Sequence, residues 1–569
     1  MAKRRRKEVP MSRILIIGLD GASPHLIRQW QNELPNLARL IEGGKFGVLQ
    51  SITPPRSIPA WYCFATGTNP AKLGVFGFSQ RLPGTYDYTF ANFTYCRTRP
   101  FWDYLGEAGL TTAVIHLPGT FPPRPLHGVM VSGWPAPANH GSLVYTHPPA
   151  LSREIDAILG QPFEFLSPHP IARDNDELMW QERLRILRLH TRTALHVLRT
   201  TPWQVGVVVL SPLDRASHQF WKHMDPTHPQ HNPAHAARLG DALLDIYRAH
   251  DDAVGQLLDL ITPDDWVFIV SDHGFGPTHR VFYLNEWLIQ QGYLVLKEKP
   301  QAGRLTWRTR LLGRAAAPLF WLNHHSETFR RLAAPFKKRA LSNAVRHAYV
   351  RTKTQGLVRL NHLPVDWSRT RAYCPDEGAL YLNLKGRDPQ GIVEPGQEAE
   401  RLLDEIEAGL RALQPPDTTQ PLEAHIIRKE AVYEGPYMLD APDMLVALDH
   451  YRTDVMAEVG AGMWDLNPVR SANHTPEGVL VAHGPGIAAG SATGGLMDIA
   501  PTVLHMLGIP VPEEMDGRVL LDLFTEESAI RRRPVTYAAT AVHEGAGEAF
   551  SEEDQAYIEK QLRDLGYLG

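Results

Sequence analysis

Seven polar residues, spread over more than four hundred positions of the chain, have the side-chain chemistry of a metal site. Three are aspartates, three are histidines and one is a serine: Asp20, Ser57, Asp214, His218, Asp272, His273 and His474. Carboxylate oxygen combined with neutral imidazole nitrogen suits zinc or manganese better than calcium or a thiolate-held metal. Most of the seven lie at or just past a strand-like apolar run. Together they can build a two-metal hydrolase.

The spacing within two of the motifs supports metal binding. Asp214 and His218 are four positions apart in SPLDRASHQFW, so one turn of helix would place both on the same face. Asp272 and His273 follow an apolar run in VSDHGFG, where Gly274 lets the backbone turn away closely. Each motif alone also has a structural explanation, such as a helix cap or a capped turn. Their joint occurrence in these places favours the metal site.

Ser57 lies in a turn-rich stretch, TPPRSIPAW. A serine hydroxyl ionises far above neutral pH and is a poor nucleophile by itself. A divalent cation bound to its oxygen would hold the alkoxide and shield it from the negative charge of a phosphate. An isolated serine in such a stretch would otherwise be an ordinary turn or helix-cap residue.

The elements that must position these residues alternate along the chain. Apolar, β-branched runs predict strands, and amphipathic stretches predict the helices between them; the strands are at 14–19, 111–117, 205–210 and 266–270, and the helices at 24–40, 175–198 and 239–260. Two later runs, 443–448 and 479–482, are expected to return to the same sheet. The pattern predicts an α/β fold with a mostly parallel central sheet, helices on both faces and ligands at the carboxyl ends of the strands.

The order of these elements also predicts the domain organisation. A core interrupted by one inserted cap region accounts for the chain, with these boundaries: a basic tail at 1–10, the first part of the core at 11–295, the cap at 296–440, the second part of the core at 441–535 and a C-terminal tail helix at 536–569.

The cap contains a basic segment at 303–360, with thirteen lysines and arginines against one acid, Glu327. Interleaved apolar residues predict helices packed on the core with a solvated basic face, which is the preferred interpretation. The alternative is a lid that attracts a phosphate-rich substrate or an anionic membrane surface, so peripheral membrane contact through this segment stays open.

Composition excludes several classes of protein. The 569 residues are 43% apolar with a formal charge of −4, which predicts a large globular core and argues against a stable nucleic-acid partner. Three cysteines without a CxxC motif favour a reducing, cytoplasmic location. Apolar runs are too short to predict a transmembrane helix. A homo-oligomer remains open.

The ordered motifs resemble a known group of enzymes. GLDGA, TPPRSIPAW with TGTNP, D-x-x-x-H, SDHG and NHTPEG occur in that order. This set is similar to the alkaline phosphatase superfamily, in particular its type I phosphodiesterase and nucleotide pyrophosphatase branch, and within it to a group described as predicted phosphohydrolases or phosphomutases. The resemblance runs from Met11 to the C-terminal RDLGYLG.

This resemblance implies a division of the seven residues. One divalent ion would be held by Asp20, Asp272 and His273, and the other by Asp214, His218 and His474. Ser57 would be the nucleophile between them and would form a phosphoserine, which water activated at the second ion then hydrolyses. The superfamily implies two zinc ions, with manganese as the alternative used by the cofactor-independent phosphoglycerate mutases.

Two departures from the family pattern affect the substrate. Where related pyrophosphatases have an Asn that bonds a phosphate oxygen, the matching stretch LGVFGF ends in Phe78, so that contact is expected from a backbone N–H or from Arg56. Sulfatases need Arg where this chain has Trp61, which argues against a sulfatase.

Arg56 and Trp61 also bear on whether the substrate is a monoester or a diester. Arg56 near the phosphate would favour a monoester dianion, whereas Trp61 could form a flat wall for the second substituent of a diester, although aromatics at this spacing are more often core residues. Family likeness places the diester ahead. The alternatives are a phosphomutase, which returns the phosphoryl group to a second hydroxyl, and a catalytically silent protein that binds an anion or a membrane.

Overall fold

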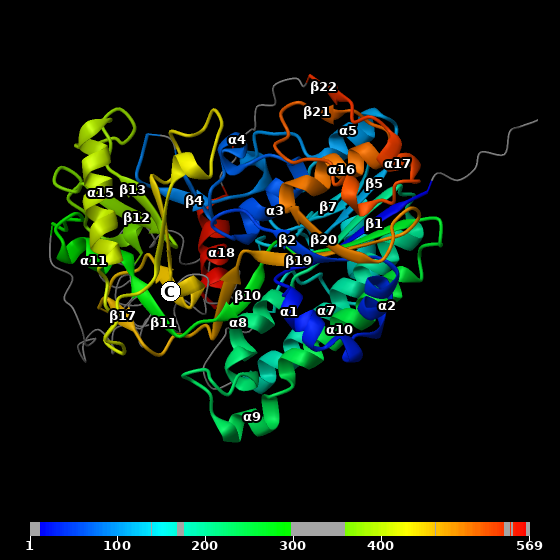
Figure 1. Ribbon diagram of the computed structural model, residues 1–569, viewed down its shortest axis with the longest axis horizontal. Coiled ribbons are helices and arrows are strands. Elements are labelled where there is room, and N and C mark those ends of the chain that lie inside the picture. The colour runs from blue at the N-terminus through cyan, green and yellow to red at the C-terminus, as the bar shows by residue number, and fades with distance from the viewer. Residues whose placement is uncertain are drawn as a thin grey trace, which may run out of the picture.

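The chain folds into two lobes, each built on its own sheet (Figure 1). The structure is a computed structural model that describes residues 12–82, 84–137, 139–167, 176–297, 359–460, 462–539, 547 and 550–564. Most of the basic segment 303–360 and all of the tail 1–10 lie outside these residues. Among the residues described, no helix combines the length and the apolar character needed to cross a bilayer.

A nine-stranded sheet forms the larger lobe, in the order β20-β2-β19-β9-β1-β8-β5-β6-β7. Only β19 and β7 run antiparallel to the rest. The strands are β1 (Ile14–Leu19), β2 (Lys45–Gln50), β5 (Thr112–Ile115), β6 (Gly128–Val131), β7 (Thr146–His147), β8 (Val205–Leu210), β9 (Trp266–Val270), β19 (Glu477–His483) and β20 (Gly490–Gly495). Every residue of β1 and β8 is buried, as expected for central parallel strands covered on both faces.

Helices cover both faces of this sheet (Figure 1). One face carries α3 (Ser57–Thr66), α5 (Phe101–Glu107) and α16 (Ile499–Met506); the other carries α1 (Pro24–Gln29), α2 (Pro35–Gly43), α7 (Asp176–Thr200), α8 (Pro212–Met224) and α10 (Ala242–Leu258). On α10 the buried side chains recur at helical spacing, because one side of the helix packs on the core and the other faces solvent.

In the part of the chain that the structure describes, the smaller lobe is a seven-stranded sheet with two α-helices, α11 (Leu284–Gln290) and α15 (Gln397–Arg411). Its strands are β11 (Arg280–Tyr283), β12 (Ala372–Asp376), β13 (Ala379–Leu382), β14 (Ala424–Arg428), β15 (Met444–Leu448), β16 (Thr453–Met456) and β17 (Trp464–Asp465). It has a separate apolar core that includes Leu380, Leu402 and Met444. Between the lobes in sequence and space lies a two-stranded ribbon of β10 (Gly274–Pro277) and β18 (Ala472–Thr475).

The predicted fold class is confirmed: an α/β protein with a mostly parallel central sheet and helices on both faces. The run 479–482 joins the central sheet as predicted, within β19. The prediction for 443–448 was wrong, because β15 pairs with β13 and β14 in the smaller sheet. A short apolar run specifies a buried strand but not which sheet receives it. A helix, α18 (Glu552–Asp564), lies within the predicted C-terminal tail helix.

Candidate metal centre

The predicted site residues gather at the carboxyl edge of the three central strands. In the register of the sheet, Leu19 at the end of β1 lies beside Leu210 of β8, and Gly18 lies beside Val270 of β9. Asp20 therefore follows β1 at the level where β8 leads into α8 and β9 leads into Asp272. Parallel strands that end at one edge bring residues distant in sequence to one place, as expected for this sheet type.

One group of ligand atoms comes from the ends of β1 and β9. His273 Nε2 lies 3.1 Å from Asp272 Oδ2 and 4.0 Å from Asp20 Oδ1. All three side chains are fully buried. Gly21 turns the chain after Asp20 with φ +75° and donates its N–H to Asp272 Oδ1 at 3.2 Å, and a Cβ there would lie 2.5 Å from the Phe275 ring. Glycine is thus required for the tight turn that places the carboxylate.

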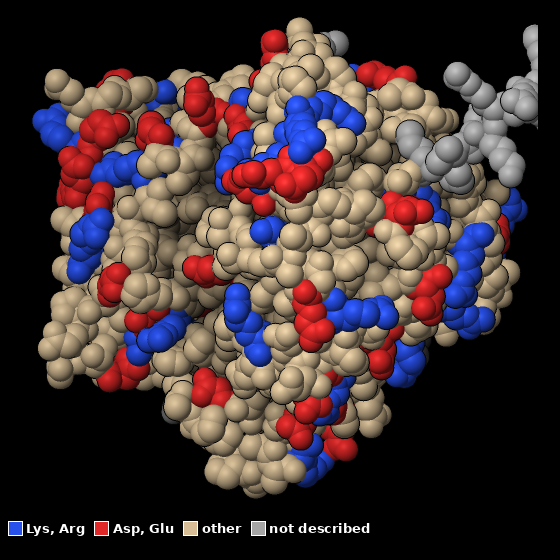
Figure 2. All heavy atoms as spheres, turned by 45° about the vertical axis from the view of Figure 1, so that its right-hand side comes forward, with Lys and Arg blue, Asp and Glu red and all other residues tan. Residues whose placement is uncertain are grey.

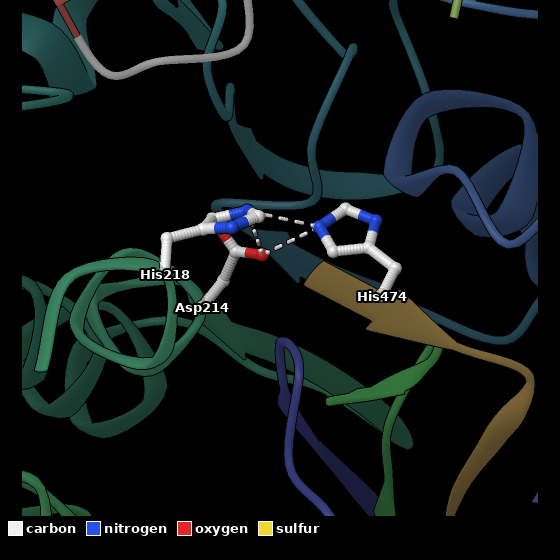
Figure 3. Close-up of side chains that lie close together, drawn as sticks. All are labelled: Asp214, His218 and His474. Carbon is white, nitrogen blue, oxygen red and sulfur yellow. Dashed lines mark hydrogen bonds and ion pairs between the residues drawn. The ribbon is translucent and has the colours of Figure 1, made fainter. Parts of the chain in front are cut away.

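A second group comes from α8 and β18 (Figure 3). His474 Nε2 lies 3.1 Å from both Asp214 Oδ1 and His218 Nε2, and His218 Nε2 is 3.6 Å from Asp214 Oδ1. Asp214 and His218 share one face of α8, as the i, i+4 spacing predicted. The β10–β18 pairing brings His474 opposite Phe275, two residues after His273.

The backbone sets the orientation of all three imidazoles. The Nδ1 atoms of His218, His474 and His273 lie 2.7, 2.9 and 3.2 Å from the carbonyl oxygens of Ala472, Pro55 and Gly274. A carbonyl oxygen only accepts, so each Nδ1 carries a proton and each Nε2 points into the site, where a neutral ring would present a lone pair to a metal ion. Lone pairs of nitrogen and carboxylate oxygen that face one another at about 3 Å repel unless a cation lies among them.

The electrostatics of the centre fit divalent cations. Burial and the neighbouring carboxylates of Asp272 and Asp214 raise the pKa of Asp20 well above its ordinary value, and burial raises the pKa of Asp272 to about 7. Burial lowers the pKa values of His218 and His273 well below the ordinary value. Within the described part of the chain, both oxygens of Asp20 and Oδ2 of Asp272 have no hydrogen-bond partner. Three buried carboxylates that need positive charge, with three nitrogen lone pairs, form a donor set suited to zinc-class ions.

Ser57 is the first residue of α3 and lies beside this centre. Its Oγ is 3.1 Å from His273 Nε2, and because that nitrogen has no proton, the hydroxyl donates to it. The first N–H groups of a helix have no partner within the helix. The N–H groups of Ser57 and Ile58 therefore lie next to the predicted nucleophile and can donate hydrogen bonds to a phosphate oxygen. The structure thus brings all seven predicted residues together.

Arg56 lies next to Ser57 but is held by a carboxylate of the smaller lobe. Its Nη1 is 3.2 Å from Asp376 Oδ2, and both side chains are almost fully buried. Although burial opposes the charge, Asp376 and Glu377 keep the pKa of Arg56 above its ordinary value. Arg56 stays charged, and its charge is largely balanced by Asp376.

Trp61 lies in the core, unlike Arg56, the other residue predicted to bind substrate. It is fully buried in α3, stacks edge-on against Phe64, and lies so close to Gly18 that a Cβ there would be 2.6 Å from the indole ring. The expected wall for a diester substituent is therefore corrected to a core contact, the alternative for an aromatic residue at this spacing. The helix turns Trp61 toward β1 rather than toward the pocket.

A pocket opens between the two lobes beside the centre, where the surface is hollowed in Figure 2. The larger lobe contributes Thr53–Arg56, the ribbon contributes His474, and the smaller lobe contributes strands β15 and β16 together with two acids, Glu377 and Asp454. Sequence analysis missed these acids, because an isolated carboxylate in a turn or a strand carries no motif. Arg470 bridges them, at 2.6 Å from Glu377 Oε1 and 3.0 Å from Asp454 Oδ2.

Sequence comparison identifies the family. Residues 14–355 match the family described as type I phosphodiesterase / nucleotide pyrophosphatase, which is more than half of the chain. The chain belongs to this family. It is therefore a phosphoryl-transfer enzyme, and it carries two groups of buried residues that can hold a divalent metal.

Relatives with assigned functions match over short segments. The 2,3-bisphosphoglycerate-independent phosphoglycerate mutase of Rippkaea orientalis is 34% identical over 95 residues, which is 16% of this chain and 18% of the relative. That of Thermomicrobium roseum is 39% identical over 82 residues, 14% and 15% of the two chains. The chain thus matches less than a fifth of these relatives' length. Among solved structures, human ectonucleotide pyrophosphatase/phosphodiesterase 5 aligns with a TM-score of 0.48 and 12% identity, covering 90% of this chain and 100% of that one.

Proposed function

We propose that the protein is a two-metal phosphodiesterase that cleaves phosphate esters through a phosphoserine on Ser57. The observation that supports this most strongly is the orientation of His218, His273 and His474, whose Nε2 lone pairs converge with buried carboxylates beside Ser57 Oγ. One ion would be held by Asp20, Asp272 and His273 and the other by Asp214, His218 and His474. When bound, zinc or manganese would supply Lewis acidity that lowers the pKa of a bound hydroxyl and neutralises phosphate charge.

The residues of the chain perform the remaining steps. Ser57 Oγ loses its proton and forms a bond to phosphorus while the bond from phosphorus to the leaving oxygen breaks, and the leaving alcohol takes up a proton. The N-terminal N–H groups of α3 orient the phosphate oxygens. Water then attacks the phosphoserine, releasing a phosphomonoester from a diester substrate and restoring the Ser57 hydroxyl.

The pairing of Arg56 supports a diester substrate. A monoester dianion profits from an additional free cation near the phosphate, whereas a diester carries one charge fewer. Because Arg56 is paired with Asp376 at 3.2 Å, little of its charge is left to compensate a second phosphate charge. The pocket between the lobes offers space for the second substituent.

Replacement of the nucleophile tests the proposal. Ser57→Ala should abolish hydrolysis of a chromogenic phosphodiester in zinc- or manganese-loaded protein, and denaturing quench of the unmodified enzyme should trap on Ser57 a phosphoryl group that still carries the second substituent of the diester. Ser51→Ala is the matched control, because the Ser51 hydroxyl is also buried but has no hydrogen-bond partner within the described residues. Full activity of Ser57→Ala, or label trapped at another residue, rejects the mechanism.

A phosphomutase is the second candidate, favoured by the matches to phosphoglycerate mutases over up to 95 residues. Such an enzyme would form the same phosphoserine and transfer the group to a second alcohol instead of water. Product analysis during turnover separates the two, since a mutase moves the phosphoryl group to another hydroxyl without net hydrolysis, whereas a hydrolase transfers the group to water. A catalytically silent protein would bind metal without either product.

We also propose a reducing compartment as the location. Cys63, Cys96 and Cys374 are all buried free thiols, as expected for such a compartment. The partner of the site would be a small phosphate ester, while membrane contact through 303–360 and self-association remain part of the hypothesis.

A further inference from the structure

A second group of metal-ligating side chains lies on the smaller lobe, outside the buried centre. It consists of Glu423, His425 and His450, and one atom of each lies within 4.8 Å of the others. Glu423 Oε2 is 2.8 Å from His450 Nε2, and Glu423 Oε1 is 3.2 Å from His425 Nε2. The three side chains are 57%, 43% and 61% exposed, so an ion can reach them directly from solvent.

Two separate segments bring these side chains together. Glu423 and His425 lie at the start of β14, where His425 pairs with Ala447 of β15. His450 lies in the turn between β15 and β16, and the Asp449 N–H at the start of that turn donates to the Glu423 carbonyl at 2.7 Å. This backbone hydrogen bond holds the two segments side by side, and the three side chains extend from them toward solvent.

The turn has an unfavourable backbone conformation. Asp449, His450 and Tyr451 all have positive φ values, 53°, 51° and 68°. The left-handed region is unfavourable for a residue other than glycine. Three such residues in a row need compensation from their contacts, and the conformation projects the His450 ring toward Glu423.

We propose that Glu423, His425 and His450 bind a divalent transition-metal ion of the zinc class. Two imidazoles and a carboxylate are ligands this class prefers over calcium or magnesium. Tetrahedral ligands at zinc lie roughly 3.3 Å apart, given bond lengths of about 2.0–2.1 Å; the contact of His425 with Glu423 Oε1, at 3.2 Å, has that length, and the contact of His450 with Oε2, at 2.8 Å, is shorter. Water would complete the coordination on the exposed side.

The position of this site gives the ion a structural role. The turn that carries His450 joins β15 and β16, and both strands line the pocket between the lobes, as does Tyr451. β14 contributes Ile427 to the same wall. An ion held by Glu423, His425 and His450 would therefore tie β14 to the β15–β16 turn and hold one wall of the pocket in place.

Metal stoichiometry tests the site in the full-length protein. Chelator-stripped wild type and His450→Asn are equilibrated with the same free zinc concentration, and bound zinc is measured per chain. Asparagine tolerates the left-handed conformation but cannot replace the imidazole. We expect His450→Asn to bind one equivalent less than the wild type, and His425→Gln, in a regular strand, to show the same loss.

His140→Gln is the control, because His140 is an exposed histidine outside the cluster and its loss should leave zinc binding unchanged. Equal zinc content in the wild type, His450→Asn and His425→Gln would overturn the proposal and leave the cluster as ion pairs only. The readout is a difference between proteins with the same buried centre, so it does not depend on how many ions that centre takes.

Discussion

The rings of His273 and His474 stack with centroids 3.5 Å apart and planes inclined by 18°. One ring follows β9 of the central sheet and the other lies on β18 of the ribbon between the lobes. Each ring belongs to a different group of predicted metal ligands, so a shift of one ring also shifts the group of the other through this packing contact. Loss of either stacked ring should therefore disturb the group to which the other ring belongs.

This contact predicts the metal content of two variants. His474→Ala removes a ligand from one group and the packing surface of His273 in the other, so we expect one ion lost and the affinity for the second lowered by roughly 10–100-fold, as for changes that disturb ligand orientation. In His218→Ala the stacked pair remains, and only one ion should be affected. Calorimetric titration with zinc compares the two, and equal losses would contradict mechanical coupling.

The ion pair between Arg56 and Asp376 predicts a change in ester preference. Asp376→Asn leaves the buried guanidinium uncompensated, which should lower the free energy of unfolding by about 3–5 kcal/mol. The freed charge lies one residue from Ser57. The ratio of kcat/KM for a phosphomonoester to that for a diester should then rise about tenfold or more, the effect of one charge-assisted hydrogen bond.

The control for this experiment is Asp388→Asn, because Asp388 is a fully buried carboxylate that pairs with Arg81 at 2.6 Å and with Arg387 at 3.0 Å. It should destabilise the protein without changing the ester ratio. If both variants shift the ratio equally, loss of stability rather than the charge of Arg56 is the cause.

The raised pKa of Asp272 predicts how metal binding depends on pH. In metal-free protein this carboxyl has a pKa of about 7, so below pH 7 an incoming ion must displace a proton. Protonation stabilises the metal-free fold at low pH, and this contribution is lost as the pH rises through about 7. Zinc affinity should therefore fall as the pH drops from 7 to 5.5. Calorimetric titrations in buffers of different ionisation enthalpy measure the protons that zinc binding releases. Asp272→Asn should bind more weakly but release fewer protons at pH 6.

Much of this centre could be predicted from sequence because each part is local. The runs 14–19, 205–210 and 266–270 match β1, β8 and β9 residue for residue, and their ends place Asp20, Asp214 and Asp272 at one edge. The smaller lobe could not be predicted in the same way. Its strands pair over long separations, as β11 does with β16, and nothing local in Asp376 indicates a partner at Arg56.

Trp61 shows the same limit on a smaller scale. Sequence places it four residues after the nucleophile, which is compatible with a pocket wall, and the structure puts both residues on α3. Whether it faces the pocket or the sheet depends on Gly18, whose missing side chain makes room for the indole on β1. That complementarity exists only after the helix is docked.

A set of buried histidines away from the metal centre predicts acid sensitivity of the fold. The His190 ring packs against His116 and Phe163 with centroids 4.6 and 5.3 Å apart, and burial lowers its pKa to about 4. Burial also lowers the pKa of His250 to about 4 and that of His116 well below its usual value. Both ring nitrogens of His116 lack hydrogen-bond partners within the described residues, so a proton there would be poorly compensated.

The sign of the effect follows from linkage. A histidine whose pKa is lowered by folding binds fewer protons in the native than in the unfolded state, so its stabilising contribution is present above the unfolded value of about 6.5 and is lost as the pH falls toward 4. Each group contributes about 1.4 kcal/mol per pKa unit. His190→Phe keeps the stacked ring and removes one titrating group, so its free energy of unfolding should fall less than that of the wild type between pH 6.5 and 4.5. Urea denaturation at both pH values measures this difference, with His140→Phe as the exposed control. A pH dependence unchanged by His190→Phe would assign the acid sensitivity to other groups.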